Sequence, residues 1–178
     1  MIHVPADDIV TTELMRRRVV LVTGKLDEEG AATVAARLLL LDRTEQAPIT
    51  LHIACRDAEV EAATTLAATI DLIGSETTAI AVGSIEGAAV ATYAAAGRRL
   101  AHPHASFVLR DPAPQSTTDD IEVAAELHRR RLDELHQRVA AATGRQPEEV
   151  AADAHQGRLL TVDDAISYGL VQHLTTER

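Results

Sequence analysis

The sequence predicts an α/β protein with a largely parallel sheet, and three observations favour this fold class. Short apolar runs with the length of buried strands alternate with stretches whose apolar residues recur at helical spacing. Hydrophobic residues make up 46% of the 178 residues but aromatic residues only 2%, so the core must consist of Ala, Val, Leu and Ile. The length suffices for one domain with a core, and we expect residues 1–178 to form a single domain.

The first half of the chain contains two strand–helix units in succession. Each strand is a short run rich in β-branched residues, and each helix has its apolar residues on one face. Asp27 is a suitable N-cap for the first helix because its carboxylate can accept a backbone N–H. The predicted elements are a short polar N-terminal arm (1–13), a strand (19–22), a helix capped by Asp27, a strand (49–55) and a helix that starts at Arg56.

The stretch from Thr78 to Gly97 is the element around which the chain is organised. A buried strand at 79–82 is followed by a turn between Gly83 and Gly87 and then by an alanine-rich helix. A strand, a glycine-bounded turn and a buried helix form the backbone of a nucleophile elbow. In such a turn the reacting side chain sits at the helix N-terminus, where free N–H groups can hold an anion.

One long helix, at about 120–143, dominates the second half of the chain. Its apolar positions follow a three-and-four spacing, Asp119 or Asp120 can cap it, and Gly144 ends it. A long helix with one narrow apolar stripe is either an ordinary surface helix or an arm that meets a partner. The shorter elements around it are a turn (98–103), a strand (105–109), a loop (110–118), a helix that starts at 146 and a last helix (162–169).

The charge and the cysteine content of the chain argue against several classes of function. A formal net charge of −10 argues against nucleic acid or an anionic membrane as the main partner. The single cysteine, Cys55, excludes an internal disulfide and fits a reducing cytoplasm. No run approaches the ~20 apolar residues of a membrane span, and no secretory signal precedes the first strand. We therefore expect a cytoplasmic protein, and no motif predicts a cofactor.

Three segments between about residues 14 and 173 carry a family resemblance through their order and spacing. They are LMRRRVVLVTGKLDEEGAATVAARLLLLD, AVGSIEGAAVATYAAAGRRLAHPHASFVLRDP and LLTVDDAISYGLVQHL. In this order they resemble the proteolytic subunit of the Clp protease, a ring-forming serine peptidase. The resemblance implies the Clp/crotonase fold, a spiral of βα units with a projecting handle, here at about 110–143.

The resemblance also implies positions for a Ser-His-Asp triad, and this chain departs from the triad at each of them. The first glycine of the elbow places the nucleophile at Gly87, whereas counting back from the end of the helix places it near Ile85. The base position holds Arg110, which stays protonated and cannot accept a proton. The position of the orienting aspartate holds Gly157. None of these side chains can perform the role that the family assigns to its position.

The oxyanion loop departs from the family pattern as well. The family's Ser-Pro-Gly-Gly is replaced by Cys55-Arg56-Asp57-Ala58, so the loop positions are Asp57 and Ala58. A carboxylate beside the hole would repel a developing oxyanion. At the position of the family's substrate-binding strand this chain has residues 113–118, which contain Pro114 and no glycine. We therefore expect that a peptide binds poorly as an added β-strand.

Other residues could in principle replace the lost groups. Ser84 is an alternative nucleophile, although its ordinary role would be an N-cap hydroxyl for the following helix. Cys55 is a second candidate, although a lone cysteine that ends a strand usually packs in the core. Two histidines of one turn, His102 and His104, are weak evidence for a metal site without a third ligand. The remaining candidates for a displaced catalytic site are His102, His104 or His155 as base and Asp153 to orient it.

The sequence therefore predicts a noncatalytic Clp-like subunit with a structural or regulatory role. It would form a homo-oligomeric ring of six or seven copies, or a double ring, or a mixed ring with a catalytic Clp subunit. An AAA+ ATPase is the further partner that the resemblance implies. The alternatives are an active peptidase with a displaced site at Ser84 and a crotonase-like acyl-binding module, against which the missing loop glycines weigh.

Overall fold

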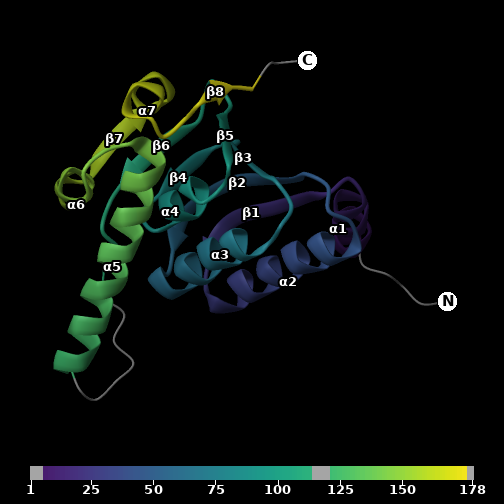
Figure 1. Cartoon of the computed structure of the whole chain (residues 1–178), viewed down its shortest axis with the longest axis horizontal. Helices are drawn as coiled ribbons and strands as arrows, with labels where there is room; N and C mark the ends of the chain where they lie inside the picture. Colours follow the sequence, from purple (N-terminus) through teal and green to yellow (C-terminus); the bar gives the residue numbers. More distant parts are fainter. Residues whose placement is uncertain (1–5, 114–120, 176–178) are drawn as a thin grey trace.

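The main sheet of the computed structural model, which describes residues 6–113 and 121–175, has five strands in the order β1-β2-β3-β5-β8. Neighbouring strands are parallel throughout this sheet. Parallel strands need crossover connections, and helices supply them (Figure 1). The predicted α/β fold class is confirmed. The strands are β1 (Val19–Leu26), β2 (Ile49–Ala58), β3 (Thr77–Ala81), β5 (Arg98–Ala101) and β8 (His173–Leu174).

The two faces of this sheet differ in burial. Leu51 and Ile53 of β2 are fully buried in the core, whereas His52 between them is half-buried on the other face. The buried face is covered by α2 (Glu28–Thr44) and α3 (Val60–Leu72) (Figure 1). As predicted, Asp27 caps α2, because its Oδ1 accepts the Gly30 N–H at 2.9 Å. Among the described elements, no pair of long helices covers the half-buried face in the same way (Figure 1).

A second, smaller sheet has three strands in the order β4-β6-β7. β4 (Ser84–Glu86) pairs in parallel with β6 (Ser106–Leu109), and β7 (Arg158–Thr161) pairs antiparallel with β6. The short helix α4 (Ala89–Ala94) follows β4, and its residues are all buried. Alanine permits this burial because its small side chain lets a helix pack closely on its neighbours.

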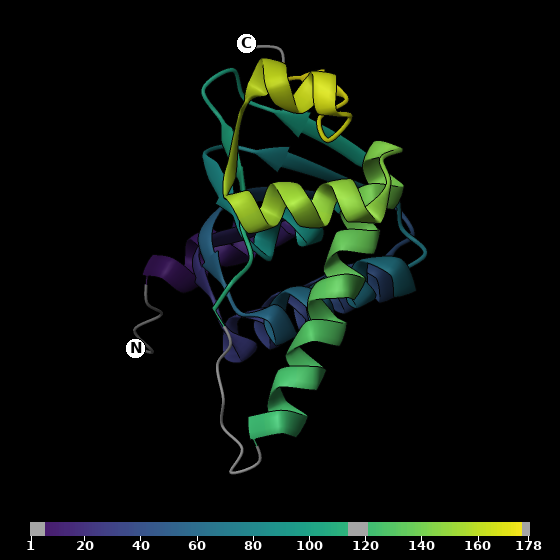
Figure 2. The same cartoon turned by 90° about the vertical axis from the view of Figure 1, so that its left-hand side faces the viewer.

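The helix α5 (Ile121–Thr143) projects beyond the body of the molecule, as two perpendicular views show (Figure 1, Figure 2). It matches the predicted long helix, and the proposed caps Asp119 and Asp120 lie outside the described residues. Gly144 follows it with φ +74°, a left-handed conformation that glycine adopts readily. Ion pairs from Arg131 to Glu61 and from Arg138 to Asp71 hold α5 against α3.

The chain then forms α6 (Pro147–Gln156) and α7 (Val162–Tyr168), close to the C-terminal end of α5 (Figure 1). Thr161 begins α7 with a capping box, since its hydroxyl and the Asp164 carboxylate each accept the other residue's N–H. Gly169 ends α7 in the left-handed region, as predicted. Within residues 6–113 and 121–175, the helices lack the combination of length and apolarity that crossing a bilayer requires.

Two predictions about the N-terminal half were wrong. The described part of the expected arm forms the helix α1 (Ala6–Arg16), which contacts β1 and places Met15 against the core. The helix expected to start at Arg56 begins at Val60, because β2 continues to Ala58 and stays paired with β1 beyond a register shift that leaves Arg56 without an aligned partner. In both places contacts with β1 decide the structure, and local sequence does not report such contacts.

The segment predicted as a turn at 98–103 contains the strand β5 instead. Within this segment Arg99 is buried, with 8% of its surface exposed. The Arg99 guanidinium donates to the carbonyl oxygens of Ala96, Ala142 and Leu170 at 3.2, 2.9 and 2.9 Å. These bonds satisfy the buried charge and join the ends of α4, α5 and α7 to the sheet.

Candidate functional site

Gly87 forms the turn between β4 and α4. Its φ is +59°, and its N–H donates to the Val108 carbonyl oxygen at 3.0 Å. A Cβ built at this position would meet only the Arg110 carbonyl oxygen, at 3.5 Å, so the space accepts a side chain. Ile85, the other candidate position for the nucleophile, is completely buried in the core. Of the two positions, Gly87 is therefore the one that a ligand could reach.

A pocket of about 370 Å³ opens beside Gly87. It brings together four positions that the sequence singled out, although they come from three separate parts of the chain. Gly157 lies elsewhere, at the C-terminal end of α6, with φ +72°. The lining residues are Arg56, Asp57 and Ala58 from the end of β2, Glu86 and Gly87 from the elbow, and Arg110, Asp111, Pro112 and Ala113 from the segment after β6.

The Glu86 carboxylate joins both arginines of this pocket. Its Oε1 accepts hydrogen bonds from Arg56 Nε at 3.0 Å and from Ser84 Oγ at 2.9 Å, and its Oε2 accepts one from Arg110 Nη2 at 3.4 Å. Burial raises the pKa of Glu86, but these hydrogen bonds and the two positive charges outweigh burial and lower the pKa overall. We call Arg56, Glu86 and Arg110 the pocket bridge.

The residues of the pocket limit its chemistry. Arg110 donates protons but cannot accept one, and Gly87 offers no nucleophilic atom. The Gly87 N–H is already bonded to the Val108 carbonyl oxygen, so it is not free to stabilise an oxyanion. The ionised Glu86 is a weak base because its pKa is lowered.

Ser84 lies in β4 and not at a helix N-terminus, so its predicted role as an N-cap was wrong. The residue at the N-cap of α4 is Ala88. The Ser84 hydroxyl donates to Glu86 and accepts a hydrogen bond from Ser106 Oγ at 3.3 Å. Within the described part of the chain, its side-chain partners are thus a serine and a carboxylate, and they include no histidine.

The histidines of the turn before β6 form a pair of their own. The rings of His102 and His104 lie 5.4 Å apart, and the His104 N–H donates to His102 Nδ1 at 3.3 Å. Across residues 6–113 and 121–175, no three His, Cys, Asp or Glu side chains converge as metal ligands would. The described structure therefore adds no third ligand to this pair.

Cys55 is completely buried near the end of β2. Its Sγ donates to the Asp57 carbonyl oxygen at 3.2 Å. Burial raises the pKa of the Cys55 thiol, and hydrogen bonds from the backbone only partly oppose this effect. A buried thiol with a raised pKa carries little thiolate at neutral pH and is a poor nucleophile.

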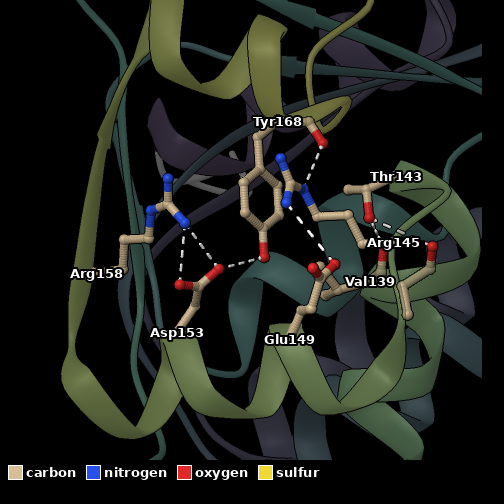
Figure 3. Close-up of polar contacts among 8 residues, drawn as sticks. Val139, Thr143, Arg145, Glu149, Asp153, Arg158 and Tyr168 are labelled. Carbon is tan, nitrogen blue, oxygen red and sulfur yellow. Dashed lines mark hydrogen bonds and ion pairs between the residues drawn. The ribbon is translucent and has the colours of Figure 1, made fainter.

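Asp153 braces the C-terminal elements and does not orient a histidine (Figure 3). Its carboxylate accepts two hydrogen bonds from Arg158 Nη1, both at 3.0 Å, and one from the Tyr168 hydroxyl at 2.9 Å. The Tyr168 ring lies between two guanidinium groups, 3.9 Å from that of Arg145 and 5.3 Å from that of Arg158. These contacts tie α6, β7 and α7 together.

A histidine–aspartate pair beside the pocket was not predicted from the sequence. His136 of α5 lies with Nε2 2.9 Å from Asp111 Oδ1, while the exposed His155 lies with Nδ1 3.8 Å from Asp111 Oδ2. His136 also lines a small cavity of about 30 Å³ together with Gly87. The sequence did contain one signal for His136. Its spacing places it in the apolar stripe of the long helix, so its ring faces the body of the protein.

The spiral of βα units, the elbow and the projecting helix together define the class of Clp/crotonase-like α/β proteins. The sequence model of the Clp protease family matches residues 5–178. The chain therefore belongs to the Clp protease family, and the resemblance found in the sequence is confirmed.

Relatives and solved structures agree with this assignment. The ATP-dependent Clp protease proteolytic subunit 1 of Streptomyces avermitilis is 30% identical over 173 residues, which cover 94% of this chain and 80% of the relative. Subunit 3 of Streptomyces coelicolor is 28% identical over 176 residues, with the same coverage. The structure of ClpP1 from Listeria monocytogenes superposes with a TM-score of 0.84 at 27% identity, covering 95% of this chain and 97% of the other. A mutant of the same Listeria protein gives 0.85 at 29% identity, with the same coverage.

Proposed function

We propose that this chain is a noncatalytic, ClpP-like subunit with a structural or regulatory role in a Clp-type complex. The observation that carries the proposal is the pocket bridge. Arg110, at the position of the family's base, donates to Glu86, and Gly87, at the turn, has no side chain to activate. In an active peptidase these elements would carry the nucleophile, the base and the oxyanion loop. In this chain, ion pairs link them to one another.

Covalent labelling tests this proposal. A fluorophosphonate probe should leave the purified chain unlabelled, and short peptides should not be hydrolysed, with an active Clp peptidase as positive control. Labelling that disappears in Ser84→Ala would support the alternative of a displaced site. Labelling that survives in Ser84→Ala and disappears in Cys55→Ala would instead identify the thiol.

Restoration of the triad tests the account of the oxyanion loop. The triple variant Gly87→Ser, Arg110→His, Gly157→Asp should show little activity, because Asp57 still faces the pocket and the loop glycines are absent. The variant also removes one partner of Glu86, so its folding must be checked by circular dichroism. Strong peptidase activity in the triple variant would contradict this account of the loop.

The crotonase-like alternative receives less support from the elbow. Acyl binding in that superfamily needs two free backbone N–H groups, and the N–H of Gly87 is already used by Val108. The alternative is tested by isothermal titration with an acyl-coenzyme A. Saturable binding at micromolar concentration would favour it over a purely structural role.

Assembly is the second part of the proposal. Clp protease family members form oligomeric rings that associate with Clp ATPases. Two apolar surfaces on different sides of the main sheet support a ring of this chain. The sheet face consists of Leu21, His52, Ile80, Val82 and Leu100 on the side away from α2 and α3. The leucine patch consists of Leu39, Leu40 and Leu72 on the outer surface of α2 and α3.

Two different patches that meet head to tail generate a ring when the rotation closes. Leu40 and Leu72 have 60% and 77% of their surface exposed, and exposed apolar residues that gather on one surface are typical of interaction sites. Native mass spectrometry near neutral pH tests this part. Six or seven copies, or twice that number, would support the ring. A monomer or dimer would mean either that assembly requires a catalytic sister subunit or that the long helix α5 serves something other than ring contacts.

A further inference from the structure

The pocket beside the elbow contains two arginine–aspartate pairs from different parts of the chain. Arg56 and Asp57 lie at the end of β2, and Arg110 and Asp111 follow β6. Glu86 lies between the two arginines and accepts a hydrogen bond from each. Groups of both signs therefore line one pocket of about 370 Å³. A simple anion in this pocket would meet the aspartates, and a simple cation would meet the arginines.

Both arginines keep hydrogen-bond donors for a ligand. Glu86 takes only the Nε–H of Arg56 and one N–H of Arg110 Nη2, whereas a guanidinium group has five N–H donors. The other donors find no partner within residues 6–113 and 121–175, and the two side chains are 79% and 55% exposed. Because one carboxylate holds both guanidinium groups in place, they form a preorganised fork for the carboxylate of a ligand.

The two aspartates supply acceptors in the same pocket. The Asp57 carboxylate accepts no hydrogen bond from the residues that the structure describes, and it acts on the Lys25 ammonium group only through its charge. Asp111 Oδ1 contacts His136, whereas Asp111 Oδ2 has only the exposed His155, at 3.8 Å. A carboxylate offers about four lone-pair sites to donors, so both aspartates retain capacity for an ammonium group.

We propose that this pocket binds a small zwitterion, whose carboxylate contacts Arg56 and Arg110 and whose ammonium group contacts Asp57 and Asp111. Free α-amino acids and dipeptides share this chemistry. The inference rests on the proposed function, because it assigns a ligand to a pocket that no longer performs hydrolysis. A bound zwitterion would connect the end of β2 to the segment after β6, and it would raise the free energy of unfolding as the site fills.

The small cavity beside the pocket limits the side chain of the ligand. This cavity has a volume of about 30 Å³ and adjoins the pocket at Gly87 and Pro112. Its lining is mainly apolar and includes Val90, Leu135 and Val139. Such a volume holds about one water molecule or one methyl group. We therefore expect alanine to suit the site better than an aromatic amino acid.

Isothermal titration calorimetry of the full chain near neutral pH tests the proposal with L-alanine and L-alanyl-L-alanine. The N-acetylated form of each ligand lacks the ammonium charge, and the amide of each lacks the carboxylate. At least one of the two zwitterions should bind saturably with a dissociation constant of about 1 mM or lower. Each capped form should bind at least about tenfold more weakly, and so should a ligand with phenylalanine in place of the C-terminal alanine. The tighter of the two zwitterions identifies the source of the ligand.

Two substitutions test the two charges of the ligand separately. Asp57→Asn should weaken zwitterion binding about tenfold and leave binding of the N-acetylated form unchanged, because that form has no ammonium group. Arg56→Gln should weaken zwitterion binding in the same way and leave binding of the amide unchanged. Arg98→Gln is the matched control, because Arg98 is exposed on β5 and does not line the pocket. Circular dichroism checks that each variant is folded.

The possible failures are distinguishable. If neither zwitterion binds at up to about 10 mM, or if the capped forms bind as tightly, the inference is refuted and the noncatalytic role stands. If Asp57→Asn and Arg56→Gln bind the zwitterion as the unchanged chain does, the ligand lies elsewhere and the inference is refuted as well. NMR of the dipeptide mixture shows whether free alanine is released. Release that requires the protein would overturn the proposed function, and the inference would fail with it.

Discussion

Arg110 Nη2 lies 3.4 Å from Glu86 Oε2, across the pocket that opens beside Gly87. Arg56 approaches the same carboxylate from the end of β2. The contact joins the elbow to the segment after β6, and only 13% of the Glu86 side chain is exposed. Because so little of this carboxylate is exposed to solvent, its negative charge must be stabilised by its hydrogen-bond partners. Glu86 is therefore the most informative position to substitute.

Glu86→Gln should destabilise the fold by about 1–3 kcal/mol, because two guanidinium groups lose their anion and a mostly buried carboxylate loses its charge-assisted hydrogen bonds. Urea denaturation at neutral pH measures the loss. Arg56→Gln is the matched control, and its effect should be smaller because 79% of the Arg56 side chain is exposed. Equal effects of the two changes would mean that the bridge does not depend on the burial of Glu86.

The advantage of Glu86 over glutamine should depend on pH. The folded-state pKa of Glu86 is lowered from its ordinary value of 4.5, so its carboxylate stabilises the fold above about pH 4.5. This contribution is lost as the pH falls through the lowered pKa. The difference in unfolding free energy between the two proteins should therefore shrink between about pH 5 and pH 3. A difference that stays constant over this range would argue against an ionised bridge.

Tyr168→Phe should cost about 1 kcal/mol, since the phenol loses its hydrogen bond to Asp153 while the ring keeps its place between Arg145 and Arg158. Thermal denaturation provides the measurement. Tyr168→Ala should cost several times more, because it also removes a buried ring. If phenylalanine were as harmful as alanine, the hydroxyl and not the packing would hold α6, β7 and α7 together.

Two glycines with similar backbones should respond differently to alanine. Gly144 and Gly169 both have a positive φ, +74° and +88°. A Cβ at Gly144 would meet nothing within 4 Å, so Gly144→Ala should cost only the ~1 kcal/mol of a left-handed alanine. A Cβ at Gly169 would lie 2.6 Å from the Thr143 carbonyl oxygen, so Gly169→Ala should cost clearly more. Similar midpoints in urea would contradict the close approach of Gly169 to α5.

The long periodic elements and the strand β6 could be predicted from the sequence, whereas several short strands could not. The helix α5 and its end at Gly144 follow from sustained spacing and a glycine. β4, β7 and β8 have two to four residues, too few for any period to be visible. β5 was predicted as a turn because a buried arginine is recognisable only from the carbonyl oxygens around it, and Arg99 finds these far along the chain.

The same limit applies to the pocket. Gly87 and Arg110 were found by sequence because they lie in segments with a recognisable order. The partner of Arg110 was not found, because Glu86 becomes its neighbour only when β4 pairs with β6. The contact between Asp111 and His136 spans 25 positions and leaves no local pattern. Another residue, Asp153, was a candidate to orient a histidine, and only the fold shows that α7 and β7 supply its partners.

The pocket bridge also sets the order in which substitutions at this site can be tolerated. A histidine at position 110 alone would leave Glu86 with one exposed arginine, so the step is costly while Glu86 remains. Replacing Glu86 costs about 1–3 kcal/mol by itself, but it leaves Arg110 unpaired and in contact with water, so a later change at position 110 costs little more. The effect of a substitution at position 110 therefore depends on the residue at position 86. A histidine at position 110 is tolerated best in a protein in which Glu86 has already been replaced.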